Sequence, residues 1–176
     1  MPGMPRLVDP HHPSLGALVH YDFNMPGAFS YEQALMAIRR LGLSMAAIEE
    51  QFRRIVFNVI ARNQDDHVKN IAFLMDKEGR WSLSLAIDLV YSYNPRGSWT
   101  SSHQMTINGK RDHFTFQDFK TCEDASSMKR GAAERIVEQV QSAVLAWPDF
   151  ADEAGVDAST IKKIQSVHRT DILTKA

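Results

Sequence analysis

The stretch that decides the fold is ARNQDDHVKNIAFLMDKEGRWSLSLAIDLV, residues 61–90. Between Asp65 and Asn70 it gathers two carboxylates, an imidazole, an amine and an amide. Two runs of alternating apolar residues follow, and a further carboxylate, Asp88, comes at the end of the second run. This order predicts a polar loop, a β-hairpin and a carboxylate just beyond the hairpin.

The hairpin is predicted because the apolar residues change from helical spacing to alternation. Residues 71–75 and 80–87 alternate apolar and other side chains, and the polar turn 76–79, DKEG, lies between them. On the second strand we expect one face to carry four apolar side chains: Trp81, Leu83, Leu85 and Ile87.

Two helices are predicted before the polar loop. Segment 30–42 opens with a capping box, Ser30 with Gln33, and closes at Gly42, a common helix stop. Segment 44–62 follows, with Ser44 as its cap. Its apolar residues recur at helical spacing over four turns: Ile48, Phe52, Ile55, Val56 and Val59. The polar loop begins directly after this helix.

The remaining segments complete a mainly α (α+β) fold. Residues 1–28 hold five of the seven prolines and predict an extended arm, with a short helix or strand within 14–23 and a surface loop at His11 and His12. Residues 91–111 read as a loop. Helices are predicted after Thr115, over 128–147 until Pro148, and over 157–169. We therefore expect an arm, 1–28, and one helical domain, 29–176.

Composition excludes several classes of protein. The 176 residues are 44% hydrophobic and 23% charged, as in ordinary globular domains. A net charge of −1 argues against a strongly polyanionic partner, so direct nucleic-acid binding is not expected. Cys122 is the only cysteine, which excludes a disulfide framework and favours a reducing cytoplasm. No apolar run has the length of a signal peptide or a membrane span.

The polar cluster has the parts of a phosphoryl-transfer site. A carboxylate after a helix can accept a proton from an attacking hydroxyl, and an amide and a second carboxylate can hold Mg²⁺. Asp65 and Asn70 have the D-x-x-x-x-N interval of the protein-kinase catalytic loop, which Asp66 does not. The alternative is a polar turn in which Asp65 and Asn70 bond nearby backbone groups and Asp88 merely ends a strand.

The segment FRRIVFNVIARNQDDHVKN, residues 52–70, followed by W-x-L-S-x-A-x-D-L, residues 81–89, resembles the HipA-like serine/threonine kinases of bacterial toxin–antitoxin modules. MTINGKRDHFTFQDF, residues 105–119, is also similar, and the resemblance extends over about 14–168. It implies a protein-kinase-like C-terminal helical lobe whose hairpin carries the metal-binding Asp88. Asp65 would be the catalytic base, and Asn70 and Asp88 would hold magnesium.

The resemblance also implies cofactors and partners. Lys69 would contact a phosphate of ATP and His67 would brace the loop, so both are candidate cofactor-binding residues. Nothing in the sequence matches the N-terminal lobe that grips ATP in this family, so little or no activity is expected from this polypeptide alone, and whether it is an enzyme stays open. The implied partners are a separate N-lobe or a second copy, a DNA-binding antitoxin, and a protein substrate from the translation machinery.

Three other functions are open, the first implied by the resemblance and the other two by the residues. The chain can be a non-catalytic regulator or partner-binding module of a toxin–antitoxin system. Residues 30–54 have the helix–glycine–helix order of a DNA-binding helix-turn-helix, but the second helix is too apolar to lie in a groove. A metal-dependent hydrolase would use Asp65, His67 and Asp88, although zinc and two-metal sites usually have more histidine ligands than this cluster offers.

Overall fold

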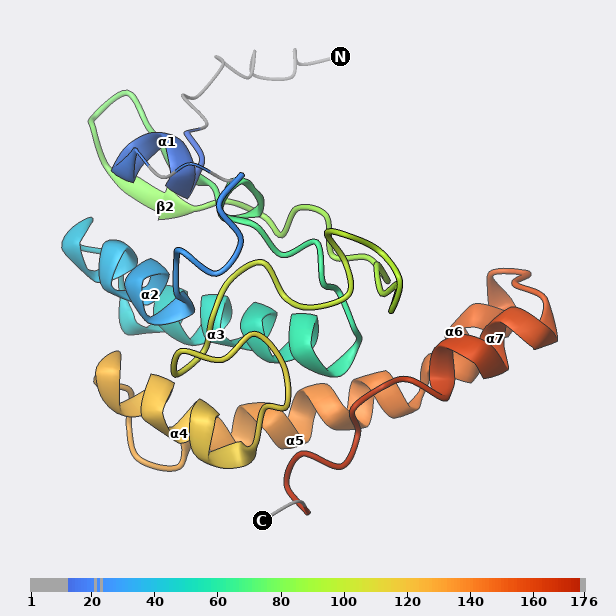
Figure 1. Cartoon of the computed structure of the whole chain (residues 1–176). Coiled ribbons are helices and arrows are strands. Elements are labelled where there is room, and N and C mark those ends of the chain that lie inside the picture. The colour runs from blue at the N-terminus through green and yellow to red at the C-terminus, as the bar shows by residue number, and fades with distance from the viewer. Residues whose placement is uncertain (1–12, 21, 23, 175–176) are drawn as a thin grey trace, which may run out of the picture.

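The computed structural model describes residues 13–174 except 21 and 23. The chain is mainly helical with one two-stranded antiparallel sheet, which confirms the predicted fold class (Figure 1). In order, its elements are α1 (Leu15–Val19), α2 (Tyr31–Arg40), α3 (Met45–Ile60), the short 3-10 helix η1 (Val68–Asn70), β1 (Phe73–Met75), β2 (Trp81–Leu83), α4 (Phe116–Ala125), α5 (Ala132–Leu145), α6 (Trp147–Glu153) and α7 (Ala158–Gln165).

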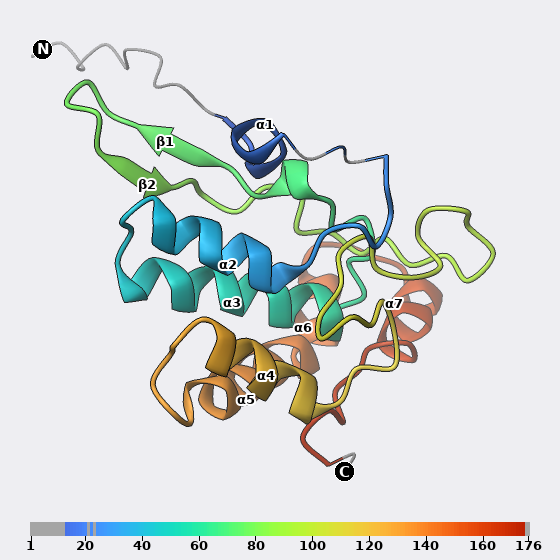
Figure 2. The ribbon, with the colours of Figure 1, turned by 60° about the vertical axis from the view of Figure 1, so that its left-hand side comes forward.

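Helix α3 is the centre of the molecule. It packs against α2 on one side and α5 on the other, and the views agree on this layering (Figures 1 and 2). Phe52 of α3 is fully buried and meets Phe119 of α4 edge-to-face, with ring centroids 6.2 Å apart. The predicted caps form: Ser30 and Gln33 make a capping box at α2, and Ser44 accepts from the backbone of α3. The helical prediction for 30–60 is confirmed.

The hairpin forms in the predicted place, but it is shorter than expected. Phe73 pairs with Leu83 and Met75 with Trp81, and beyond them the N–H of Ser84 still donates to the carbonyl of Ala72 at 3.0 Å. Leu85 and Ile87 lie beyond β2 and are 87% and 41% exposed, so the prediction that they continue the apolar face of the second strand is wrong. The physical reason is that the buried Arg54 donates from Nη2 to the carbonyl of Ser84, 2.9 Å away, which removes that acceptor from strand pairing.

The C-terminal helices differ from the prediction at their boundaries. Gly131 has a φ of 87°, a left-handed conformation that a helix interior does not allow, so α5 begins at Ala132 rather than at 128. Pro148 lies in the first turn of α6, where its missing N–H costs nothing, so it starts a helix that the sequence pattern did not suggest. The predicted apolar face of α5 is buried: Ala133, Ile136, Val137, Val140 and Val144.

The described part of the N-terminal arm packs onto the hairpin. Leu15 in α1 is fully buried, and its N–H donates to the carbonyl of Ile71 at 2.7 Å. Phe73 donates to the carbonyl of Pro13 at 3.0 Å. Leu15 therefore belongs to the hydrophobic core, and Leu18 and Val19 pack against it. The predicted loop at His11 and His12 lies outside the described residues.

Among the described residues, the longest apolar helices fall short of what a bilayer crossing requires.

Candidate functional site

The five predicted site residues lie around the end of α3. Asp65, His67, Lys69 and Asn70 occupy the loop after this helix and the short helix η1. Asp88 follows the hairpin and returns to the same place, because its backbone carbonyl accepts a hydrogen bond from Nδ2 of Asn63, 2.8 Å away. The structure thus joins the two halves of the motif through a residue outside it.

Asn63 is the hub of this arrangement, and it is 1% exposed. Its Nδ2 also donates to Oδ1 of Asn58 at 3.0 Å, and its Oδ1 accepts from the hydroxyl of Ser92 at 2.8 Å. The same hydroxyl oxygen accepts the N–H of Asp65 at 3.0 Å. One buried amide and one hydroxyl therefore fix the backbones of Asp65 and Asp88 together.

The side chains of Asp65 and Asn70 face outward from this hub. Asp65 has a half-exposed carboxylate, whose Oδ1 lies 3.9 Å from Nε2 of His67. Asn70 donates from Nδ2 to the carbonyl of Asp65 at 2.9 Å. This bond orients the amide so that its oxygen Oδ1 is left without a donor among the described residues. Asn70 thus makes the bond to nearby backbone that a simple polar turn would have. The carboxylate of Asp65 makes no such bond among the described residues.

Asp88 is exposed and has a φ of 51°. This left-handed conformation is uncommon for a residue with a side chain, and such outliers gather at functional sites. The hydrogen bond from Asn63 holds the backbone there, while the described residues offer no hydrogen-bond donor to the carboxylate. Because its backbone is held and its carboxylate has no donor, Asp88 is suited to bind a metal ion.

Asp66 has a different role from its neighbour, because it is buried. Its Oδ2 accepts from the hydroxyl of Tyr31 and lies near Nδ1 of His103, both at 2.7 Å, and its Oδ1 accepts the N–H of Gln104 at 2.7 Å. Burial alone would raise the pKa of Asp66, but its interactions with His103, then Tyr31 and Gln104, outweigh burial and lower it. Asp66 braces the loop and leaves Asp65 as the accessible carboxylate.

The brace continues to the C-terminal segment. Nε2 of the fully buried His103 lies 3.3 Å from Nη1 of Arg169, which also forms an ion pair with Asp112. The N–H of Arg169 donates to the carbonyl of Ile60 at 2.9 Å, at the end of α3. Sequence reasoning missed this network, since its members are far apart in the chain. The signals within reach were two amides, Asn58 in the apolar last turns of α3 and Asn63 three residues after the helix ends.

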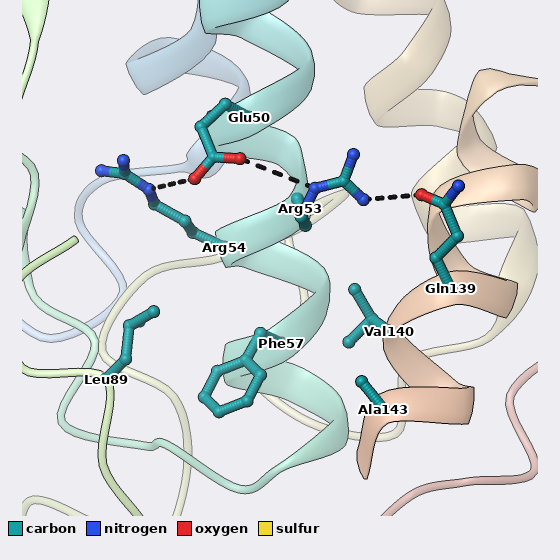
Figure 3. Close-up of a pocket in the computed structure, with 8 residues that line it drawn as sticks. All are labelled: Glu50, Arg53, Arg54, Phe57, Leu89, Gln139, Val140 and Ala143. Carbon is teal, nitrogen blue, oxygen red and sulfur yellow. Dashed lines mark hydrogen bonds and ion pairs between the residues drawn. The ribbon is translucent and has the colours of Figure 1, made fainter. Parts of the chain in front are cut away.

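A cavity of about 220 Å³ lies between α3 and α5 (Figure 3). Phe57, Val140 and Ala143 line it together with Leu89, the residue after Asp88. At its rim Glu50 bridges two arginines, with Oε1 at 3.0 Å from Nε of Arg54 and Oε2 at 3.5 Å from Nε of Arg53 (Figure 3). This rim supports the segment that carries Asp88, because Arg54 also holds the Ser84 carbonyl.

The donor set fits magnesium better than zinc. Among the described residues no three His, Cys, Asp or Glu side chains are grouped to hold a metal ion, so Asp65, His67 and Asp88 do not make a zinc-type cluster. Magnesium is commonly held by one or two protein oxygens together with substrate phosphates and waters. The Asn70 amide oxygen and the Asp88 carboxylate are oxygens of that kind.

The chain belongs to the family of HipA-like C-terminal domains, whose model matches residues 10–147. Its fold is similar to that of a HipA chain of Shewanella oneidensis MR-1, from a complex of the toxin–antitoxin proteins HipA and HipB with operator DNA. The TM-score is 0.76 and the identity 16%, and the match covers 99% of this chain and 46% of that chain. The 176 residues thus span about half of that HipA chain. No curated protein matches the sequence.

Proposed function

We propose that this chain provides the catalytic lobe of a HipA-like serine/threonine protein kinase. The observation that carries the proposal is the Asn63–Ser92 hub, which fixes the backbones of Asp65 and Asp88 while their carboxylates stay exposed. Phosphoryl transfer depends mainly on positioned groups, so a rigid frame around two accessible carboxylates is what this reaction needs.

In this proposal each motif residue has one task. Asp65 accepts the proton of the substrate serine or threonine hydroxyl as it attacks. Asn70 and Asp88 hold Mg²⁺ through their side-chain oxygens, and bound magnesium neutralises charge on the ATP phosphates. Lys69 contacts a phosphate, and His67 braces the loop beside the Asp65 carboxylate, 3.9 Å away.

The proposed site is a half-site, so the polypeptide alone is expected to transfer little or no phosphate. The nucleotide-binding half would come from elsewhere in a longer chain or from another subunit. The segment that carries Asp88 has large apolar side chains in solvent: Leu85 at 87%, Ile87 at 41% and Val90 at 55% exposure. The nucleotide-binding half is the proposed cover for this patch, and light scattering that shows a dimer of this chain would instead assign it to self-association.

Partners follow from the family. By analogy with the HipA–HipB–DNA complex, a DNA-binding antitoxin is the proposed regulatory partner. The proposed substrate, a protein of the translation machinery, rests on the sequence resemblance alone. A chain that binds such an antitoxin and no nucleotide would be a non-catalytic module of the same system, which is the second outcome of the experiment below.

The test is a titration of magnesium–ATP into the isotope-labelled protein, followed by backbone NMR. We expect localised shifts at residues 65–70 and around Asp88 in the wild type, lost in Asp88→Asn and kept in the control Asp124→Asn, an exposed carboxylate on α4. An unchanged spectrum at millimolar ligand would contradict the kinase assignment for these residues. The remaining function would then be that of a partner-binding module.

A further inference from the structure

Two adjoining cavities lie between the segment after Asp88 and the C-terminal end of the described chain. The larger, about 790 Å³, is walled by residues 112–115 and 166–172 with Arg62 and Tyr93. The smaller, about 500 Å³, lies between residues 91–96 and 163–167. Tyr93, Ser166 and Val167 line both, so the two adjoin on one surface, called here the basic groove.

The walls of the basic groove carry more positive than negative charge. Asp112 and Asp171 are its carboxylates, and Asp112 is already ion-paired with Arg169. With that ion pair set aside, Arg62, Arg96 and Lys163 are the cations that face Asp171, and His113 and His168 lie beside them. A chain with a net charge of −1 has thus concentrated cations on one surface, which attracts an anionic ligand.

Arg62 is the groove residue nearest in sequence to the proposed catalytic base, Asp65. Its Nε donates to the carbonyl of Val167 at 2.8 Å, and its guanidinium lies 4.3 Å from the ring centroid of Tyr93. Its backbone has a left-handed φ of 61° and accepts the N–H of Ser92 at 3.2 Å. These contacts hold the guanidinium in the groove, and the described residues give its two terminal amino groups no hydrogen-bond acceptor.

The cations of the groove repel one another. Burial, followed by the positive charge of Arg62, lowers the pKa of Arg169 to about 10. The same two causes lower the pKa of His168. An anion bound between these side chains would reduce the repulsion, so the charges of the groove favour binding of an anionic ligand.

We infer that the basic groove binds an acidic segment of the protein substrate, with Arg62 as the anchor for a carboxylate. The inference rests on the proposed kinase function, because it places that segment beside Asp65. Arg62 precedes Asp65 by three residues, so their Cα atoms are at most roughly 11 Å apart. A glutamate or aspartate a few positions from the phosphorylated serine or threonine would therefore reach Arg62.

A peptide fits this groove better than a nucleic acid does. Asp112 and Asp171 interrupt the positive wall and would repel a continuous row of phosphates. A peptide carries its charges at separate positions and can avoid those carboxylates. The tyrosines and Phe114 in the wall supply apolar contact for the rest of the segment.

The test measures fluorescence anisotropy of a labelled serine-containing peptide with flanking glutamates, added to the 176-residue chain without nucleotide or magnesium. A matched peptide has glutamine in place of each glutamate. We expect the acidic peptide to bind more tightly, and salt to weaken it. The double variant Arg96→Gln with Lys163→Gln, at two exposed positions, should weaken binding about fivefold, and Arg62→Gln should weaken it further.

Arg130→Gln is the control, since Arg130 is an exposed cation before α5 and outside the groove. Equal binding of the two peptides, or no loss in the double variant, would overturn the inference. Tighter binding of a labelled single-stranded oligonucleotide through the same residues would also overturn it. Because nucleotide and magnesium are absent, the outcome is independent of the magnesium–ATP titration, so failure of the groove and failure of the catalytic assignment are distinguishable.

Discussion

The side chain of Asn63 donates to the backbone carbonyl of Asp88, 2.8 Å away and 25 residues further along the chain. The end of the central helix thereby sets the position of a carboxylate that comes after a hairpin. An amide that belongs to no catalytic motif thus decides how the motif is assembled.

Replacing Asn63 should weaken both the fold and the site. Asn63→Ala removes three hydrogen bonds and leaves buried partners unsatisfied, which we expect to lower the free energy of unfolding by about 3 kcal/mol. Urea unfolding followed by circular dichroism measures this. The exposed Gln117→Ala on α4 is the control and should change stability by less than about 0.5 kcal/mol. Equal midpoints for the two variants would contradict the role of Asn63.

Two neighbouring arginines should differ sharply in their contribution to stability. Arg54 is 9% exposed and holds Glu50 and the Ser84 carbonyl, so Arg54→Ala should cost about 2–3 kcal/mol. Arg53 has a side chain 38% exposed, and Arg53→Ala should cost less than about 1 kcal/mol. The comparison needs only the two denaturation curves. A larger loss in Arg53→Ala would show that the Arg54 contacts do not support the Asp88 segment.

Asp66 should make the fold sensitive to acid. Its pKa in the folded protein lies below the usual value of 3.8, because His103, Tyr31 and Gln104 outweigh the effect of burial. The unfolded chain therefore binds the proton first, and stability from Asp66 is present above about pH 4 and lost as the pH falls through the folded pKa. Denaturant unfolding from about pH 7 to about pH 3 checks this.

The matched variants for this experiment are Asp66→Asn and the exposed Asp124→Asn. Asp66→Asn should be less stable than the wild type near pH 7, and the difference should shrink as the pH falls. Asp124→Asn should follow the wild type throughout. A constant difference between Asp66→Asn and wild type across the range would rule out the linkage.

Cys122 should be unreactive while the protein is folded. Burial, with a smaller contribution from the charge of Glu32, raises the pKa of this fully buried thiol, which keeps it neutral near pH 8. Alkylation by iodoacetamide should therefore be slow in buffer and fast in about 6 M urea. Mass spectrometry follows the rate. Similar rates in the two solutions would show that α4 opens readily.

The local features of the fold could be predicted from the sequence, and the long-range ones could not. Caps at Ser30 and Ser44, helical spacing in α3 and the Gly79 turn are signals within a few residues, and each gave the right element. Gly131 and Pro148 were read less well, because a glycine or proline ends one helix or begins another according to its neighbours. The extent of β2 depended on Arg54, a residue 30 positions away from Ser84.

The same division holds for the candidate site. The interval from Asp65 to Asn70 and the later Asp88 pointed to the motif, whose catalytic role stays a prediction. The residues that hold the motif in place were not predicted, because Ser92 and His103 carry no pattern that distinguishes a brace from a loop residue, and Asn63 stands out only as an amide shortly after an apolar helical turn. Their importance comes from burial and from contacts across 25 or more residues.

The carboxylate of Asp66 is reached by Tyr31, His103 and Gln104 from 35, 37 and 38 residues away. Helices form from near neighbours, whereas these contacts need loops to close, and closing long loops is the slow part of folding. The loop that presents Asp65 should therefore take shape after the helices. On gentle heating the order reverses, and the chain can keep its helical signal in circular dichroism after its candidate site has come apart.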